Sequence, residues 1–335
     1  MTKNMADTTV LVTGGTGSIG RALVDELVRL NAKRIVVFSR DEMKHFNLRR
    51  ETRGLPVDTV VGDVRDSRSL DEVCAGFNFD VLYHVAAMKH VSVCENAPFE
   101  AVLTNVVGTQ HVLDAARRHG IGRVVVVSTD KAVLPTTVLG ASKLLAERLT
   151  IAAARQSDSR QVLCVVRFGN VLGSRGSVIP LWLEALRNHR PLEITDPRVT
   201  RFAMRIPEAA HLVVTASGEA RSGDILVLKM KALELGALAN VMRERIAPNL
   251  GVEPSSVETV VTGLVPGEKL HEQLLGPDEV TRANEMGGAL VVAPVWRDTR
   301  HQLAAGGGWC NSSDIAPRLT PDEIETLVGE QLPPG

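Results

Sequence analysis

Several features that would indicate other classes of protein are missing from this chain of 335 residues. Lys and Arg total 38 against 39 Asp and Glu, so the basic excess typical of nucleic-acid or anionic-membrane binding is absent. No apolar run approaches the roughly 20 residues of a membrane-spanning helix. The polar stretch 1–9 lacks the apolar segment of a signal peptide. We therefore expect a soluble, cytoplasmic protein with no nucleic-acid or membrane partner.

Cysteines and aromatic residues are also few. The four cysteines, Cys74, Cys94, Cys164 and Cys310, form no CxxC pair and have no histidine at ligand spacing, which predicts reduced thiols and no metal site. Aromatic residues make up 3% of the chain, and Tyr83 is its single tyrosine. Tyr83 is therefore the single candidate for a reaction step that needs a tyrosine hydroxyl.

What the first half does contain is a regular alternation of strand-like and helix-like segments. Continuous runs rich in Val and Ile are typical of strands buried on both faces of a parallel sheet. They occupy Thr9–Thr13, Arg34–Ser39, Thr59–Asp63, Val81–Val85, Val124–Ser128 and Val162–Arg167. Amphipathic stretches such as Val106–Arg118 and Ala141–Ala154 lie between them. This alternation predicts an α/β fold with a Rossmann-type doubly wound parallel sheet.

The pattern changes after Gly173, where proline and glycine become frequent and segments shorten. A helix is expected from Pro207 to about Ser217, a strand over Asp224–Leu228, and a loop at Gly306–Gly308. Thr320 followed by Pro and Glu predicts a capped helix start. We expect a nucleotide-binding domain over 1–172, with a return segment near 203–230, and a smaller α/β substrate-binding domain over 173–335.

A glycine-rich loop directly follows the first predicted strand and opens the first helix. Gly14, Gly17 and Gly20 stand at GxxGxxG spacing, and Thr16, Ser18 and Ile19 complete the loop. Such a loop gives a tight turn, close backbone approach to a pyrophosphate and phosphates on the positive helix end. The alternative is a plain turn, but the strand–turn–helix context favours a dinucleotide site.

The end of the second strand distinguishes the two nicotinamide cofactors. An NAD site usually has a carboxylate here for the ribose hydroxyls, whereas this chain has Ser39 and Arg40, which suit the 2′-phosphate of NADP. NADP is therefore favoured over NAD. The alternative is a solvated Arg40 beside an Asp41 that only caps the next helix. Asp63 and Val64, which end strand three, are candidate adenine contacts.

Polar residues end the fifth strand, where side chains of a doubly wound sheet face the ligand. Asp130 and Lys131 stand side by side, and an acid next to a base can transfer protons at adjacent substrate atoms. Taken alone, the pair is equally compatible with a turn-capping Asp130 and a solvated Lys131.

Longer motifs carry a specific resemblance. The chain resembles the extended short-chain dehydrogenase/reductases and, within them, the UDP-N-acetylglucosamine 4,6-dehydratases of the polysaccharide-biosynthesis (CapD-like) group. The matching stretches include Phe38–Glu42, Gly62–Asp66, His84–Val91, Thr104–Thr109, Ser128–Lys131, Arg167–Val171, Gly173–Ser177, Ile194–Asp196, Thr200–Phe202, Pro266–Glu272 and Asn311–Asp314. They are far more specific than the glycine motif alone.

The resemblance implies an NADP-dependent hydro-lyase that converts UDP-N-acetylglucosamine into a 4-keto-6-deoxy sugar nucleotide, with or without inversion at C5. Lys131 would be the base at C5, Asp130 the acid at C6, Thr129 a hydrogen-bond partner of the 4-oxygen, and Lys143 the ligand of the nicotinamide ribose. A sugar-nucleotide C4 oxidoreductase or epimerase, and a non-catalytic NADP-binding protein, are the alternatives.

Leu139 departs from the superfamily pattern, because it stands where a tyrosine usually precedes the lysine by four residues. Leucine accepts no proton, and Tyr83, inside strand four, is expected to be a core residue. Some dehydratases of this group carry methionine at this position, and Leu139 is read as a variant of that kind. Asp130 or Thr129 would then accept the 4-hydroxyl proton.

The resemblance also assigns binding residues and an assembly. It places Ala86, Ala87, Lys89 and Asn105 at the cofactor. On the substrate side it places Lys89 near the sugar, Asn170, Ser177 and Val178 near the diphosphate and uracil, Arg201 at the diphosphate and Glu268 at the uridine ribose. A homo-oligomer built through helices of the nucleotide-binding domain is expected.

Overall fold

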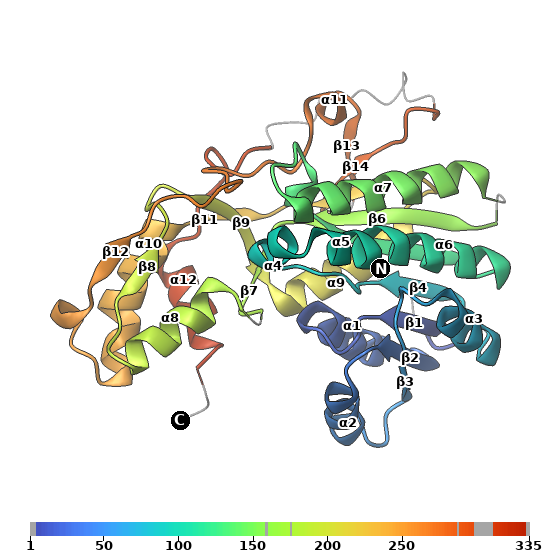
Figure 1. Ribbon diagram of the computed structural model, residues 1–335, viewed down its shortest axis with the longest axis horizontal. Helices are drawn as coiled ribbons and strands as arrows, with labels where there is room; N and C mark the ends of the chain where they lie inside the picture. The colour runs from blue at the N-terminus through green and yellow to red at the C-terminus, as the bar shows by residue number, and fades with distance from the viewer. Residues whose placement is uncertain (1–4, 158–159, 175, 287, 298–310, 333–335) are drawn as a thin grey trace. The chain divides into compact units, whose positions relative to one another are not determined.

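The computed structural model describes residues 5–157, 160–174, 176–286, 288–297 and 311–332. Cys310 and the expected loop at Gly306–Gly308 lie outside these residues. The chain divides into two compact units (Figure 1). The first comprises Met1–Phe168, Pro207–Lys229 and Leu275–Gly306, and the second Gly169–Ile206, Met230–Leu274 and Gly307–Gly335.

A nine-stranded sheet forms the centre of the first unit, in the order β13-β14-β10-β6-β5-β4-β1-β2-β3. Its strands are β1 (Thr9–Thr13), β2 (Arg34–Ser39), β3 (Val57–Val61), β4 (Val81–His84), β5 (Arg123–Thr129), β6 (Val162–Phe168), β10 (Ile225–Leu228), β13 (Ala283–Met286) and β14 (Ala289–Val292). The strands from β3 to β10 pair in parallel, and β14 and β13 add an antiparallel edge. The expected Rossmann-type α/β fold is confirmed.

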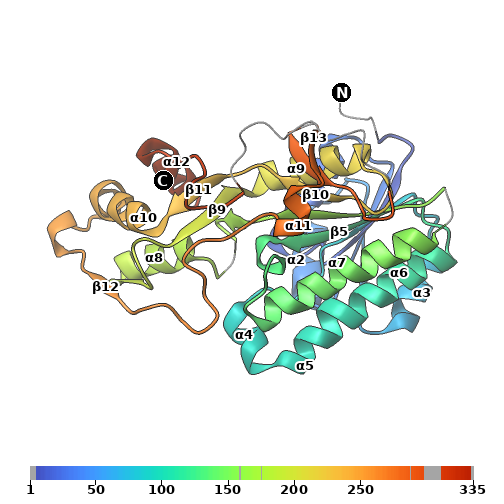
Figure 2. The same ribbon diagram turned by 90° about the horizontal axis from the view of Figure 1, so that it is seen from above.

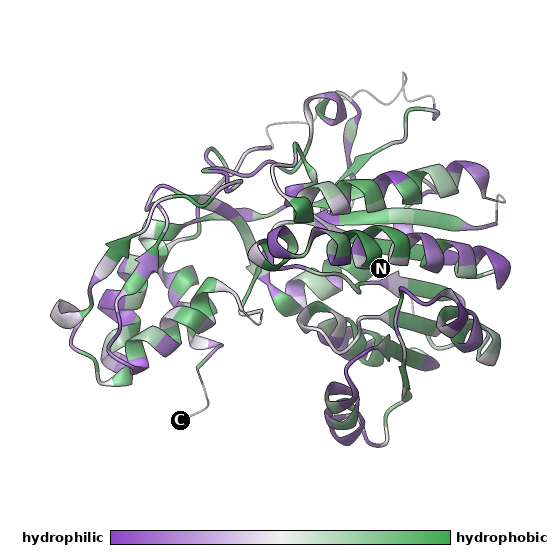
Figure 3. Cartoon of the chain, in the orientation of Figure 1, coloured by the Kyte–Doolittle hydropathy of each residue, from purple (hydrophilic) through white to green (hydrophobic). Residues whose placement is uncertain are grey.

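Helices cover both faces of this sheet (Figure 2). They are α1 (Ser18–Arg29), α2 (Glu42–Glu51), α3 (Ser67–Gly76), α4 (Val91–Asn96), α5 (Pro98–Ala101), the π-helix η1 (Val102–Val107), α6 (Gly108–Arg118), the 3₁₀ turn η2 (Asp130–Ala132), α7 (Val138–Gln156), α9 (Ile206–Glu219) and α11 (Pro277–Val280). Helices α3, α6 and α7 pack together over one face, and α9 lies on the other. The β-branched strand residues are buried between these layers, and Figure 3 shows the central strands as the most hydrophobic part of the unit.

In its described residues, the second unit contains two small sheets and three α-helices. Its elements are β7 (Asn170–Leu172), α8 (Val178–Arg187), β8 (Leu192–Ile194), β9 (Thr200–Arg205), β11 (Lys231–Glu234), α10 (Leu235–Val241), the short helical turns η3 (Met242–Ile246), η4 (Ala247–Leu250) and η5 (Pro254–Ser256), β12 (Thr259–Val261) and α12 (Pro321–Gly329). One sheet has the order β11-β9-β7 and the other pairs β12 with β8. Thr320 caps α12 together with Glu323, as its sequence predicts.

Several boundaries differ from the sequence-based expectation, among them the following three. Strand β3 spans Val57–Val61 rather than Thr59–Asp63, and its ladder with β2 ends with the bond from the Gly62 N–H to the Ser39 carbonyl. The helix expected from Val106 begins earlier, as the π-helix η1. Residues 275–297 were expected in the substrate-binding domain, but they lie in the first unit, where β14 pairs with β10.

Candidate active site

The glycine loop has the geometry that close approach to a ligand requires. Gly14 has φ +72°, and a Cβ there would lie 2.6 Å from the backbone nitrogen of Ala86. A Cβ on Gly20 would collide with the Gly14 carbonyl. Gly17 is the N-cap of α1 and makes no side-chain cap, so the first N–H groups of this helix are not satisfied by a capping side chain. A glycine cradle at an uncapped helix N-terminus fits a dinucleotide pyrophosphate.

A hydrogen-bonded group of side chains closes the end of β2. The Ser39 hydroxyl lies 2.9 Å from Thr16 Oγ1 and 2.8 Å from His45 Nε2, and burial lowers the pKa of His45. Arg40 is half exposed, with its guanidinium 3.7 Å from Asp63. Asp41 caps α2 through the Lys44 N–H. Asp41 therefore does cap the next helix. The Arg40 side chain is directed toward Asp63 and not toward Asp41.

Lys44 is a basic residue of this region that the sequence analysis did not single out. It lies in the first turn of α2, and its ammonium is 2.7 Å from the Asp41 carboxylate. In the sequence, the signal for Lys44 was the presence of a basic residue one helical turn after Arg40. Together the two residues bring two cations to the end of β2, next to the glycine loop.

The two adenine candidates occupy different environments. Asp63 accepts hydrogen bonds from the backbone and side chain of Arg65. Burial acts to raise the Asp63 pKa, but these bonds outweigh it and hold the pKa below its ordinary value. Val64 is 5% exposed and packs in the core beneath α6. Asp63 is thus already engaged by arginines, and Val64 presents only apolar surface.

Asn105 supports the site from inside the protein. It is 1% exposed, its Oδ1 accepts from the Met88 N–H at 2.8 Å, and its Nδ2 donates to the Met88 carbonyl and to Ser142 Oγ. The side chain therefore holds the segment after β4, which carries Ala86, Ala87 and the exposed Lys89. A direct cofactor contact by Asn105 stays a prediction.

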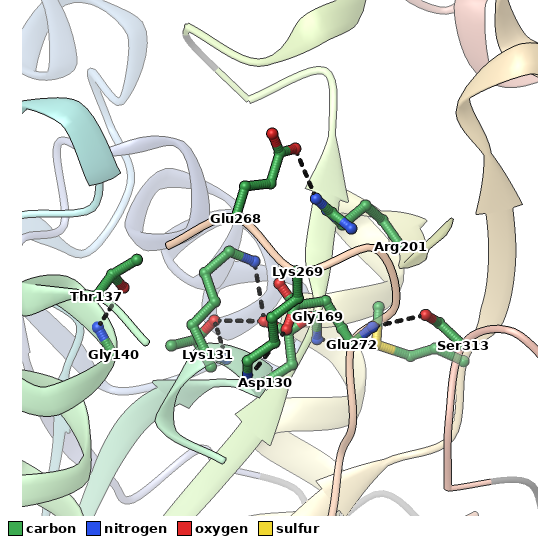
Figure 4. A network of polar contacts seen from close by, with 12 residues as sticks. Asp130, Lys131, Thr137, Gly140, Gly169, Arg201, Glu268, Lys269, Glu272 and Ser313 are labelled. Atoms are coloured by element: carbon green, nitrogen blue, oxygen red, sulfur yellow. Dashed lines mark hydrogen bonds and ion pairs between the residues drawn. The ribbon is translucent and has the colours of Figure 1, made fainter. Parts of the chain in front are cut away.

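The catalytic candidates form a compact group at the end of β5 (Figure 4). Thr129 Oγ1 donates to Asp130 Oδ1 at 2.8 Å, and Lys131 Nζ lies 3.1 Å from the same oxygen. Asp130 is 0% exposed, and among the described residues its Oδ2 has no hydrogen-bond partner. An orphaned, buried carboxylate oxygen next to an ammonium is costly unless a ligand group meets it.

Helix α7 brings Lys143 to the same strand. Lys143 is 6% exposed, and its Nζ donates to the Val127 carbonyl at 2.6 Å. Burial lowers the pKa of Lys143 to about 8, against an opposing effect of Glu147. The helix is capped by Thr137, and a Cβ on Gly140 would collide with the Lys131 carbonyl (Figure 4). Glycine at this position allows α7 to pack directly on the η2 turn.

No polar side chain replaces the usual tyrosine at its own position. Leu139 is 5% exposed and packs in an apolar cluster with Cys94 and Ala101. Tyr83 is 2% exposed within β4, and burial raises its pKa to about 12. The predicted core role of Tyr83 is confirmed, since a hydroxyl buried in this way is not available to a substrate.

All the substrate candidates except Lys89 lie in the second unit. Arg201 Nη2 donates to Glu268 Oε1 at 2.7 Å (Figure 4). Thr195 donates to the same oxygen. Asn170 begins β7. Ser177 occupies the N-cap position of α8, which starts at Val178, but its buried Oγ makes no capping bond and has no hydrogen-bond partner among the described residues. The structure thus pairs Arg201 with Glu268, a pairing that the sequence did not predict.

In the described part of the chain, no group of three or more His, Cys, Asp or Glu side chains is placed to hold a metal ion. Among the helices of that same part, none is long and apolar enough to cross a membrane.

Comparison with known proteins agrees with this architecture. The chain is 44% identical over 293 residues to the uncharacterized membrane protein MJ1061 of Methanocaldococcus jannaschii, covering 86% of each chain. It is 39% identical over 300 residues to a UDP-glucose 4-epimerase of Rickettsia felis, covering 88% of this chain and 85% of that one.

Two solved structures are similar. Pen from Bacillus thuringiensis superimposes with a TM-score of 0.89 at 36% identity, covering 98% of this chain and 99% of that chain. DesIV, a dTDP-glucose 4,6-dehydratase from Streptomyces venezuelae solved with NAD and TYD bound, shares the fold with a TM-score of 0.65 at 24% identity, covering 78% of this chain and 86% of that chain.

The strand order, the glycine loop and the lysine of α7 define an extended short-chain dehydrogenase/reductase. Within this class, the chain belongs to the family of polysaccharide biosynthesis proteins. The model of that family matches residues 10–294.

Proposed function

We propose that this protein is an NADP-dependent sugar-nucleotide 4,6-dehydratase that acts on UDP-N-acetylglucosamine. The observation that carries the proposal is the buried Asp130, whose Oδ1 contacts both Thr129 and Lys131 while Oδ2 has no partner among the described residues. Dehydration across C5 and C6 needs one base and one acid close together. These side chains supply both.

A nicotinamide cofactor held by the glycine loop and Lys143 would supply the hydride chemistry, that is, oxidation at sugar C4 and return of the same hydride at C6. The 4-ketone acidifies the C5 proton, which Lys131 removes as the C5–H bond breaks. Asp130 protonates the C6 hydroxyl, which leaves as water. The proton that Asp130 delivers to C6 is the one released by the 4-hydroxyl, so Asp130 starts as a carboxylate and Lys131 enters the step as a free amine.

The same group supports proton removal without a tyrosine. Thr129 donates to Asp130 Oδ1 at 2.8 Å, so a 4-hydroxyl proton taken up by the threonine oxygen can pass to the carboxylate. Leu139 then serves only as packing. Lys143, held by the Val127 carbonyl, would bind the nicotinamide ribose.

Arg40 and Lys44 support NADP as the cofactor. Two cations at the end of β2 suit the 2′-phosphate, and the sequence has no carboxylate at the position of Arg40. Arg201, Glu268, Asn170, Ser177 and Val178 are the proposed substrate-binding residues of the second unit.

Self-association is part of the proposal. Several large apolar side chains of the first unit are exposed on neighbouring helices, namely Val93 of α4, Phe99 of α5, Val102 of η1 and Leu145 of α7. Apolar surface of this kind is typical of an interface.

A C4 epimerase is the second candidate, because relatives 38–40% identical carry the name UDP-glucose 4-epimerase. Mass spectrometry of UDP-N-acetylglucosamine incubated with protein and NADP in deuterated water separates the two. Dehydration predicts a product lighter by one water that carries solvent deuterium, whereas epimerisation keeps the mass.

The variant Lys131→Ala should lose this product at least a thousandfold while it still binds NADP, and Tyr83→Phe, the control, should keep it within about twofold. Normal turnover by Lys131→Ala would refute the assigned role. An unchanged substrate with every UDP-sugar would favour a non-catalytic NADP-binding protein.

A further inference from the structure

A continuous chain of buried hydrogen bonds crosses the first unit beneath the glycine loop. Thr13 Oγ1 lies 2.7 Å from His84 Nδ1, His84 Nε2 lies 3.0 Å from Thr109 Oγ1, and Thr109 Oγ1 lies 2.6 Å from the Asn105 carbonyl. The four residues are each at most 1% exposed. They come from β1, β4, α6 and η1, so the chain joins four separate elements.

The direction of each bond follows from counting protons. The Thr109 hydroxyl has one proton, which it donates to the Asn105 carbonyl, so it accepts from His84 Nε2–H. The neutral ring then carries no proton on Nδ1, which accepts from the Thr13 hydroxyl. Burial, together with the charge of Lys143, lowers the pKa of His84 to about 3, which agrees with a neutral ring. These hydrogen bonds from Thr13 to the Asn105 carbonyl therefore allow one arrangement of protons.

Both ends of this chain reach the cofactor machinery. Thr13 immediately precedes Gly14, whose N–H donates to the Phe38 carbonyl. At the other end, the Asn105 side chain bonds both backbone groups of Met88 and the Ser142 hydroxyl, one residue before Lys143. The glycine loop and the lysine of α7 are thus linked through His84 and Thr109.

We propose that His84 and Thr109 are positioning residues that fix the glycine loop relative to the Met88 segment and the Lys143 helix, and thereby set the affinity for the nicotinamide cofactor. The inference rests on the proposed cofactor site. Neither residue is expected to touch the cofactor. A cofactor that is held by both the glycine loop and the Lys143 helix binds tightly only if these two parts of the protein are already in place, because ordering them on binding would consume binding energy.

The test compares Thr109→Val with two matched variants. Thr109→Val keeps the shape but leaves His84 Nε2–H without an acceptor, and we expect the Kd for NADP, measured by calorimetry, to rise about tenfold. Thr109→Ser restores the hydroxyl and should bind within about twofold of wild type. Thr150→Val is the control. Thr150 is 0% exposed and donates to the Ala146 carbonyl at 2.8 Å within α7, so it takes no part in the hydrogen-bond chain of His84.

A second readout separates positioning from general stability. The Met88 N–H donates to Asn105, so its hydrogen exchange should become faster in Thr109→Val and stay unchanged in Thr150→Val. The KM for the sugar nucleotide should change less than twofold, since none of the four chain residues is a substrate candidate. If Thr109→Val does not fold, Thr13→Val, which removes the donor to His84 Nδ1, is judged by the same criteria.

The outcomes are distinct. A wild-type protein that binds neither NADP nor NAD contradicts the proposed function. Wild-type binding with an equal Kd in Thr109→Val, or an equal weakening in Thr109→Val and Thr150→Val, overturns the positioning role alone.

Discussion

A buried ion triad gives the sharpest prediction about stability. Arg167 of β6 donates to both carboxylate oxygens of Glu147 in α7, at 3.0 and 2.6 Å, and to both of Glu279 in α11, at 2.7 and 3.0 Å. The three side chains are 1%, 1% and 5% exposed. Replacing Arg167 by Met would leave two buried carboxylates without the guanidinium that bonds both of them.

The expected magnitude follows from burial. Removing one member of a buried ion pair typically costs about 3–5 kcal/mol, because the remaining charge stays desolvated. Here two carboxylates lose their partner, so Arg167→Met should lower the free energy of unfolding by at least about 3 kcal/mol. Arg68→Met is the control, since Arg68 is 86% exposed and its ion pair with Glu72 should contribute at most about 1 kcal/mol.

Urea unfolding followed by circular dichroism measures both variants. The pH dependence adds a second criterion. Burial acts to raise the Glu279 pKa, but the bonds from Arg167 hold it below the ordinary value of 4.5. The contribution of Glu279 is therefore fully present above pH 4.5 and is lost as the pH falls through its lower folded value. A loss below about 1 kcal/mol at pH 7 for Arg167→Met, or one equal to that of Arg68→Met, would refute the reasoning.

Two further predictions concern the cofactor site. Gly20→Ala should abolish NADP binding in calorimetry, because its Cβ would collide with the Gly14 carbonyl. The control Gly218→Ala in α9, with no atom within 4 Å of its Cβ, should leave binding unchanged. Equal affinities of the two variants would contradict the close packing of the loop. Burial lowers the pKa of Lys143 from 10.5 to about 8, so the unfolded chain binds more protons between these values. Wild-type stability should therefore rise relative to Lys143→Met by about 1–2 kcal/mol between pH 8 and 9.5 in urea unfolding, and a constant difference would show that Lys143 is not desolvated.

Local sequence patterns were sufficient for some of the elements. The Val- and Ile-rich runs predicted β1 and β2 at their observed bounds, because a strand buried on both faces needs continuous apolar residues. The glycine spacing predicted the loop before α1, and the Thr320 capping box predicted the start of α12. Each of these signals lies within a few neighbouring residues, so the amino-acid sequence alone determines it.

The tertiary structure alone decided which distant side chains meet. Arg167 and Glu279 are 112 residues apart in sequence, Thr13 and His84 are 71 apart, and Arg201 and Glu268 are 67 apart. No local pattern encodes such pairs, because a polar residue in a strand looks the same in sequence whether its partner is water or a buried carboxylate. The return of residues 275–297 to the first unit, through β14 pairing with β10, was hidden for the same reason. Hydrogen bonds and ion pairs between distant segments exist only once the sheet has brought those segments together, and these contacts hold the candidate site in place.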